Sequence, residues 1–141
     1  MFLDELEEGD SFTSPSKTLT DAHVVFFAGL TGDNRPIHYD VEYAKRTRFG
    51  KPLAHGLLLA SMTVLGASSI AHRLDGFIFQ EQGSRFLKPV SVGDTLQPRH
   101  TVARIWQDGH RRYVRFETSI TNQRGETVLE GFHVYRVFEP S

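Results

Sequence analysis

The chain has no cysteine and no excess of either charge, and both shortages exclude classes of function. Without cysteine it can form no disulfide, no thiolate zinc site and no cysteine nucleophile. Its 16 Lys and Arg against 17 Asp and Glu leave a formal net charge of −1, which provides no broad attraction to nucleic acid or to an anionic membrane. A charged partner must therefore be recognised by a local group of residues.

Long apolar runs are scarce as well. The segment 56–74 has no charged residue before Arg73, but Ser and Thr interrupt it, and a membrane span needs about 20 predominantly apolar residues. We interpret the segment as one buried helix of a protein without a membrane partner. The first eight residues are acidic, unlike a basic targeting segment, so we expect a soluble cytoplasmic protein.

The remaining pattern predicts an α+β fold in a single domain over residues 1–141, because a chain of this length with 39% hydrophobic residues suffices for one core. An apolar helix followed by four antiparallel strands is buried most simply when the sheet wraps around the helix. The expected elements are a strand from Ser11 to about Leu19 interrupted by Pro15, helices at 20–32, 41–46 and 56–74, and strands at about 77–87, 94–106, 112–122 and 126–138.

The segment from Thr31 to Asp40 carries the chemistry. Asp33 and His38 are five residues apart, a spacing that would place them about 140° apart on a helix. Glycine, asparagine and proline in the same segment indicate a curved loop instead, which can aim both side chains at one point. An acid and an imidazole that share a water can perform acid-base chemistry without a metal or cofactor.

Each candidate residue also has an ordinary structural explanation, and the remaining histidines show no metal-ligand spacing, so no metal site is predicted. The structural alternatives are a turn or cap at Asp33, a loop histidine at His38, a helix cap at Asp40, a backbone hydrogen bond at His55, a turn at Gly56 and a serine bonded to its own helix at Ser61.

Two separated segments carry a family resemblance. The first contains Gly32-Asp33, Pro36-Ile37-His38, Asp40, Tyr43-Ala44, Phe49-Gly50 and Ala54-His55-Gly56, and it resembles the hydratase signature of MaoC-like, R-specific enoyl-CoA hydratases. The second, from Phe86 to Leu96, is similar to a strand-turn-strand of that family. The resemblance implies a hot-dog fold, and a homodimer or dimer of dimers with the acyl pocket near the subunit contact. It implies no cofactor beyond coenzyme A as part of the acyl-CoA substrate.

The resemblance also implies roles for individual residues. Asp33 and His38 would activate water for addition to a trans-2-enoyl-CoA, or act in the reverse dehydration of an R-3-hydroxyacyl-CoA, and a backbone N–H near Gly56 would bind the enolate oxygen. Which of the two side chains is the base stays open, because a close pair titrates together. His55 and Ser61 are further candidates for substrate contacts.

One position departs from the family pattern. The family usually has Asn immediately before the proline, whereas this chain has Arg35, with Asn34 one position earlier. If Arg35 faces the pocket, it could pair with a substrate carboxylate or a coenzyme A phosphate. The alternative is a solvated loop arginine.

Two other functions remain open from the sequence. A thioesterase on the same fold would direct the water at the carbonyl carbon instead of Cβ. A non-catalytic module would bind acyl thioesters without turnover. The acyl chain, the choice of coenzyme A or acyl carrier protein, and the physiological direction are not specified by the residues.

Overall fold

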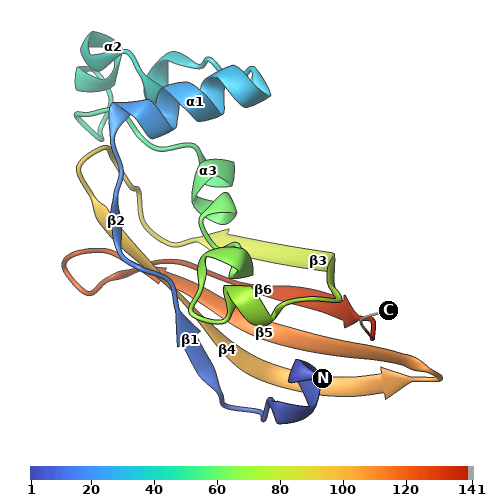
Figure 1. Cartoon of the computed structure of the whole chain (residues 1–141). Coiled ribbons are helices and arrows are strands. Elements are labelled where there is room, and N and C mark those ends of the chain that lie inside the picture. Colours follow the sequence, from blue (N-terminus) through green and yellow to red (C-terminus); the bar gives the residue numbers. More distant parts are fainter. Residues whose placement is uncertain (140–141) are drawn as a thin grey trace.

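The frame of the molecule is an antiparallel sheet that curves around a short helix (Figure 1). The computed structural model describes residues 1–139. The strands of the six-stranded sheet run in the order β1-β4-β5-β6-β3, with β2 also paired to β4. Their bounds are β1 Ser11–Thr13, β2 Lys17–Thr18, β3 Phe77–Phe86, β4 Thr95–Asp108, β5 Arg111–Thr121 and β6 Thr127–Val137.

The strand predictions are confirmed, with each end of the four long strands within two residues of its expected place. In β5, Val114 and Phe116 are buried, whereas Arg115 and Glu117, which alternate with them along the strand, face away from the core. This period of two is what alternating side chains of a half-buried strand require. Gly109, in the turn between β4 and β5, adopts a positive φ of 62°, which explains the glycine there.

The first expected strand is interrupted at Pro15, as predicted. The chain forms β1 before the proline and β2 after it, and both pair antiparallel with β4. Because proline donates no backbone hydrogen bond, the ladder breaks at this residue and resumes beyond it.

The helix expected before the candidate loop is α1, Asp21–Thr31, which begins after Thr20 and ends at Gly32 with a φ of 80°. Its expected apolar stripe is only partly buried. Val24 lies in the core, but Phe26 is 73% exposed. α1 therefore presents apolar side chains to its surroundings as well as to the core.

The second helix is α2, Val41–Lys45. The side chain of Asp40 accepts a hydrogen bond from the N–H of Tyr43 over 2.9 Å. Asp40 is therefore a helix cap, as the structural alternative had it.

The prediction of one buried helix over 56–74 is wrong. The α-helix α3 covers only Gly56–Ser61, and two 3-10 turns follow, η3 at Leu65–Ala67 and η4 at Ala71–Arg73. Three hydroxyl groups in the segment donate to carbonyls three residues earlier, each over 2.6 Å, and such bonds compete with a continuous helical ladder. The donors are Ser61, Thr63 and Ser68.

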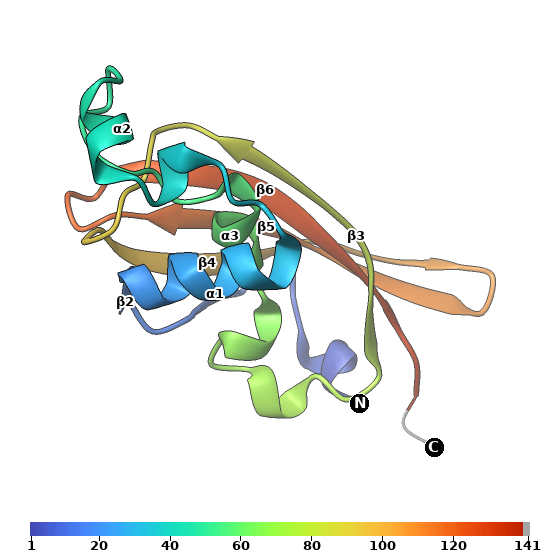
Figure 2. The same ribbon diagram turned by 90° about the horizontal axis from the view of Figure 1, so that it is seen from above.

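The short helix α3 still occupies the centre of the fold (Figures 1 and 2). Leu58 and Leu59 pack into a cluster with Ile120 and Leu129 from the inner face of the sheet. The expected arrangement, an antiparallel sheet around a central helix, is confirmed. Among residues 1–139, the structure contains no helix with both the length and the apolar character that a bilayer crossing requires.

The inner face of the sheet also buries two histidines to which the sequence assigned no site, His100 and His133. His133 Nε2 lies 2.9 Å from the hydroxyl of Thr63, whereas neither ring nitrogen of His100 has a hydrogen-bond partner within residues 1–139. Burial lowers the pKa of each histidine to about 4. Both are therefore neutral at physiological pH.

Candidate active site

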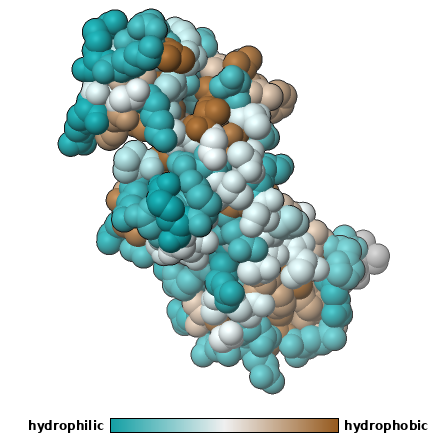
Figure 3. All heavy atoms as spheres, turned by 90° about the vertical axis from the view of Figure 1, so that its left-hand side faces the viewer, coloured by the Kyte–Doolittle hydropathy of each residue, from teal (hydrophilic) through white to brown (hydrophobic). Residues whose placement is uncertain are grey.

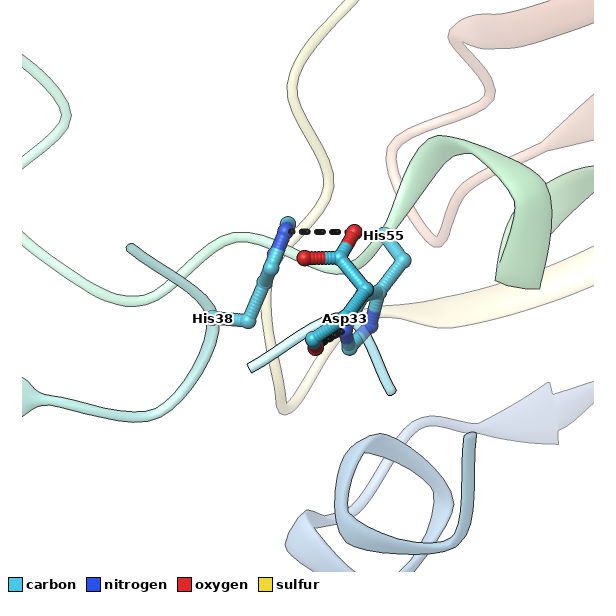
Figure 4. A group of neighbouring side chains, drawn as sticks. All are labelled: Asp33, His38 and His55. Atoms are coloured by element: carbon cyan, nitrogen blue, oxygen red, sulfur yellow. Dashed lines mark hydrogen bonds and ion pairs between the residues drawn. The ribbon is translucent and has the colours of Figure 1, made fainter. Parts of the chain in front are cut away.

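Asp33 and His38 converge, as the loop interpretation predicted (Figure 4). Gly32 ends α1, and the 3-10 turn η2, Pro36–His38, folds the chain back so that His38 faces the carboxylate. His38 Nε2 lies 3.7 Å from Asp33 Oδ2. His38 is buried and Asp33 is 33% exposed, so the pair sits at the edge of the interior with one side open.

The hydrogen bonds of His38 define which ring nitrogen carries the proton. Its Nδ1 lies 2.8 Å from the carbonyl oxygen of Leu53, and a carbonyl only accepts, so Nδ1 carries the hydrogen. In the neutral ring, Nε2 then presents its lone pair toward Asp33. Burial lowers the pKa of His38, and the opposing effects of the Leu53 carbonyl and of Asp33 do not reverse this direction.

Asp33 is held in its charged form. The guanidinium of Arg35 lowers the pKa of Asp33 below its usual value, mainly through a side-chain hydrogen bond. Asp33 Oδ1 also accepts from the backbone N–H of Arg35 over 3.4 Å, which makes Asp33 a turn residue as well. The resting pair is thus a carboxylate beside a neutral imidazole.

Arg35 contacts both members of the pair. Its Nε donates to Asp33 Oδ1 over 3.1 Å, and its Nη2 lies 3.4 Å from Asp33 Oδ2. The same Nη2 lies 3.2 Å from His38 Nε2, where it donates to the ring lone pair. The Arg35 side chain is nevertheless 70% exposed. It lies over the pair from the solvent side rather than beneath it.

His55 lies behind His38. The two rings stack with centroids 3.8 Å apart, and the Nε2–H of His55 donates to the backbone carbonyl of Asp33 over 3.0 Å (Figure 4). The ring of Phe27 also contacts the His55 ring, in a tilted arrangement with 4.9 Å between centroids. At 2% exposure, His55 is enclosed by the protein and supports the loop from the interior.

Gly56 is the first residue of α3, next to His55. No acceptor within residues 1–139 receives its backbone N–H, as expected for the first turn of a helix. A Cβ on Gly56 would meet the ring of Phe86 at 3.4 Å, so the missing side chain also allows this ring to approach. The N–H is available to a ligand, although α3 is too short to supply the dipole of a long helix.

Ser61 is not part of the Asp33–His38 group. Its hydroxyl donates to the carbonyl of Leu58, and the residue lines a separate cavity of about 380 Å³ with Ser14 and Val64 among others. A second cavity, of about 550 Å³, lies on the outer face of the sheet around Arg99 and Glu117. Asp33, His38 and Gly56 line neither of these cavities. The candidate site is open to solvent on the side of Asp33, whose side chain is 33% exposed.

The three side chains could be compared with a metal site, because ligand atoms of Asp33, His38 and His55 lie within 4.8 Å of one another. The hydrogen bonds of the two histidines argue against a metal site. His55 Nε2 donates to a carbonyl, and a guanidinium lies against His38 Nε2, where a cation would have to bind. The prediction that no metal is needed stays a prediction.

The sequence did not reveal the part played by Leu53. Its carbonyl orients His38, and its N–H donates to the carbonyl of Ile37 over 2.9 Å. Both bonds are made by the backbone of Leu53, so its side-chain type could not have indicated them. The contacts of Phe27 with His55 and of Phe86 with Gly56 were equally hidden among 11 phenylalanines.

A comparison with protein families matches residues 5–124 to the MaoC like domain. The chain is 34% identical to the "(R)-specific enoyl-CoA hydratase" of Rhodospirillum rubrum over 134 residues, covering 92% of this chain and 87% of that protein. It is 32% identical to the "3-hydroxybutyryl-CoA dehydratase" of Methylorubrum extorquens over 141 residues, covering 97% and 84%.

A similar solved structure, the (R)-hydratase from A. caviae involved in PHA biosynthesis, superimposes with a TM-score of 0.82 at 32% identity and covers 94% of this chain and 98% of that chain. The MaoC-like dehydratase from Rhodospirillum rubrum superimposes with a TM-score of 0.85 at 30% identity, covering 100% and 99%. The expected hot-dog fold is thereby confirmed. The chain belongs to the MaoC-like family of hydratases and dehydratases, which are lyases.

Proposed function

We propose that the chain adds water to a trans-2-enoyl thioester of coenzyme A, or removes water from the corresponding R-3-hydroxyacyl thioester. The observation that carries this proposal is the lone pair of His38 Nε2 directed at the carboxylate of Asp33, with Nδ1 bonded to Leu53. A water between these two side chains would meet two acceptors, which is the arrangement that deprotonation requires.

His38 is the proposed base, because its neutral ring carries on Nε2 the lone pair that can accept a proton once Arg35 has moved away. It takes a proton from water while the hydroxyl adds to Cβ, and it then delivers that proton to Cα. The carboxylate of Asp33 stabilises the imidazolium between these events. No proton is gained or lost over the cycle, so the reaction needs neither a metal nor a cofactor in this proposal.

Gly56 is the proposed binding site for the thioester oxygen. Negative charge develops on this oxygen when the hydroxyl adds to Cβ, and a preorganised N–H stabilises it. Two features support this role: the N–H has no acceptor within the described chain, and His55 links it to the catalytic loop through the carbonyl of Asp33.

We also propose a homodimer or a dimer of dimers. Within residues 1–139, β3 pairs only with β6 and leaves its other edge free, and such an edge is normally covered. Figure 3 shows hydrophobic surface over the upper, helical part of the molecule. Large apolar side chains are exposed on the helices, among them Phe26 and Leu30 of α1 and Leu57 of α3. A partner subunit would close the open side of the site. The cytoplasmic location stays a prediction.

The test uses crotonyl-CoA and the loss of absorbance of its conjugated thioester. The wild type is expected to turn over, and Asp33→Asn and His38→Gln are expected to lose at least about 100-fold in kcat, the usual contribution of general acid-base catalysis. His110→Gln, on the exposed hairpin, is the matched control. Full activity of both site variants refutes the residue assignment, and release of free thiol in place of hydration indicates a thioesterase.

A further inference from the structure

Arg35 occupies the place that the attacking water needs. A water shared by Asp33 and His38 must lie within hydrogen-bond distance of Asp33 Oδ2 and His38 Nε2. Arg35 Nη2 lies at 3.4 Å from the first atom and 3.2 Å from the second. While it stays there, the lone pair that would accept the proton is engaged. The guanidinium must move before water can be activated.

The guanidinium is free to move. Its side chain is 70% exposed, and within the described chain its only acidic partner is Asp33, which is two residues away. An exposed ion pair of this kind contributes little stability. Moving by about the size of one water would still leave the guanidinium beside His38, and therefore beside the Cβ at which the hydroxyl adds.

We propose that Arg35 makes the site selective for enoyl thioesters with a carboxylate on Cβ. Such a carboxylate accepts the two parallel N–H groups that Arg35 now gives to Asp33, and it draws the guanidinium off the lone pair of His38. A methyl group in the same place offers no acceptor, so the guanidinium returns to the pair. This inference rests on the proposed hydration and specifies its substrate class.

A phosphate of coenzyme A is the other anion that could attract the guanidinium. Its position distinguishes it, because the phosphates lie at the far end of the pantetheine arm from the reacting carbons. Thioesters of N-acetylcysteamine carry the same acyl groups without any phosphate, so they separate the two sources.

The experiment compares crotonyl-CoA with fumaryl-CoA, in which a carboxylate replaces the terminal methyl on Cβ. The wild type is expected to prefer fumaryl-CoA in kcat/KM. Arg35→Gln is expected to lower the ratio of fumaryl-CoA to crotonyl-CoA activity at least about tenfold, the usual effect of a charge-assisted hydrogen bond. Arg35→Lys, which keeps the charge without the planar fork, should retain part of the preference. Arg111→Gln, in the exposed hairpin, removes one equal charge elsewhere.

A binding measurement gives a readout that does not depend on turnover. By titration calorimetry, succinyl-CoA should bind the wild type at least about tenfold more tightly than butyryl-CoA, and Arg35→Gln should remove the difference. The N-acetylcysteamine thioesters should show the same acyl preference in turnover.

The outcomes separate the two proposals. If the wild type hydrates crotonyl-CoA but Arg35→Gln leaves the substrate ratio and the binding difference unchanged, the selectivity proposal is overturned and the hydratase proposal stands. If Arg35→Gln affects every coenzyme A thioester equally and no N-acetylcysteamine thioester, the anion is the phosphate, and the carboxylate assignment is wrong. If the wild type hydrates neither thioester, the proposed function itself fails.

Discussion

His55 donates a hydrogen bond from Nε2 to the backbone carbonyl of Asp33 over 3.0 Å, which ties the residue before α3 to the loop after α1. The two residues are 22 positions apart in the chain. The bond fixes the peptide on which the carboxylate is carried, and the His55 ring supports His38 from behind at the same time. A single buried side chain therefore positions both members of the candidate pair.

Replacing His55 by Phe keeps an aromatic ring behind His38 but removes the donor to Asp33. We expect kcat for crotonyl-CoA to fall about tenfold, since a misplaced catalytic group loses rate, while KM changes little. The free energy of unfolding should fall by about 1 kcal/mol, the usual net value of one hydrogen bond. Steady-state kinetics and urea unfolding measure the two effects, with His72→Phe as the exposed control. An unchanged kcat would show that the loop keeps its geometry without this bond.

Replacing Arg35 should change the pH at which kcat/KM falls on the acid side of its pH profile, here called the acid limb. Burial is the main cause that lowers the pKa of His38, and the charge of Arg35 adds to it. A base with a lowered pKa stays neutral in more acidic solution, so the wild type should keep its activity below the ordinary histidine pKa of about 6.5. In Arg35→Gln, the pKa values of His38 and Asp33 both rise, and the limb should move to higher pH. A profile that does not move would mean that Arg35 leaves the pair in the free enzyme.

The buried histidines should make the fold sensitive to acid. Their pKa values of about 4 lie below the ordinary value, so the unfolded chain binds protons that the folded chain does not. Stability is then complete above about pH 6.5 and declines as the pH falls toward 4, by about 3 kcal/mol for each histidine. In His100→Leu, urea unfolding at pH 7.5 and pH 5 should differ less than in the wild type. His110→Leu should leave the difference unchanged, and an equal difference in all three proteins would contradict this account.

The free edge of β3 should be the contact between subunits. Light scattering at micromolar concentration is expected to give at least a dimer. Ile78→Lys places a charge on the half-exposed edge strand, and it should weaken the dimer about tenfold or more, because burying one large aliphatic side chain is worth roughly 1.5–3 kcal/mol. Val41→Lys, the same kind of change on exposed α2, should not. A monomeric wild type would refute the edge argument.

A methyl group on Gly56 tests the proposed oxyanion site. Its Cβ would lie 3.4 Å from the Phe86 ring, so Gly56→Ala requires only a small shift of that side chain. We expect the fold to survive and kcat to fall about tenfold or more, because the thioester oxygen can no longer reach the N–H closely. Circular dichroism and unfolding check the fold. Wild-type kcat in this variant would assign the glycine to packing alone.

The sheet could be predicted from the sequence because its signals are local. Alternating burial around Val114 and Phe116 and a glycine turn at Gly109 each follow from a few adjacent residues. The early end of the helix that begins at Gly56 could not be predicted, because apolar composition does not reveal that Ser and Thr hydroxyls bond to nearby carbonyls. In that segment, side-chain hydrogen bonds prevail over hydrophobic pattern.

In the candidate site, the convergence of Asp33 and His38 could be predicted, but the hydrogen bonds that orient them could not. Glycine and proline around Asp33 and His38 favoured a loop, and the two side chains do converge. The ring nitrogen of His38 that carries the proton could not be predicted, because it depends on the backbone carbonyl of Leu53, 15 residues later. The double contact of Arg35 was also hidden, since its sequence position near Asp33 does not specify that Nη2 reaches the imidazole.

Leu53 is bonded in both directions to the segment that ends at His38. The intervening residues, 39–52, which include α2, thus form a segment whose two ends are held together by these two hydrogen bonds. Exchanges at exposed positions of this segment, such as Val41, can alter its outer surface without rotating the imidazole of His38.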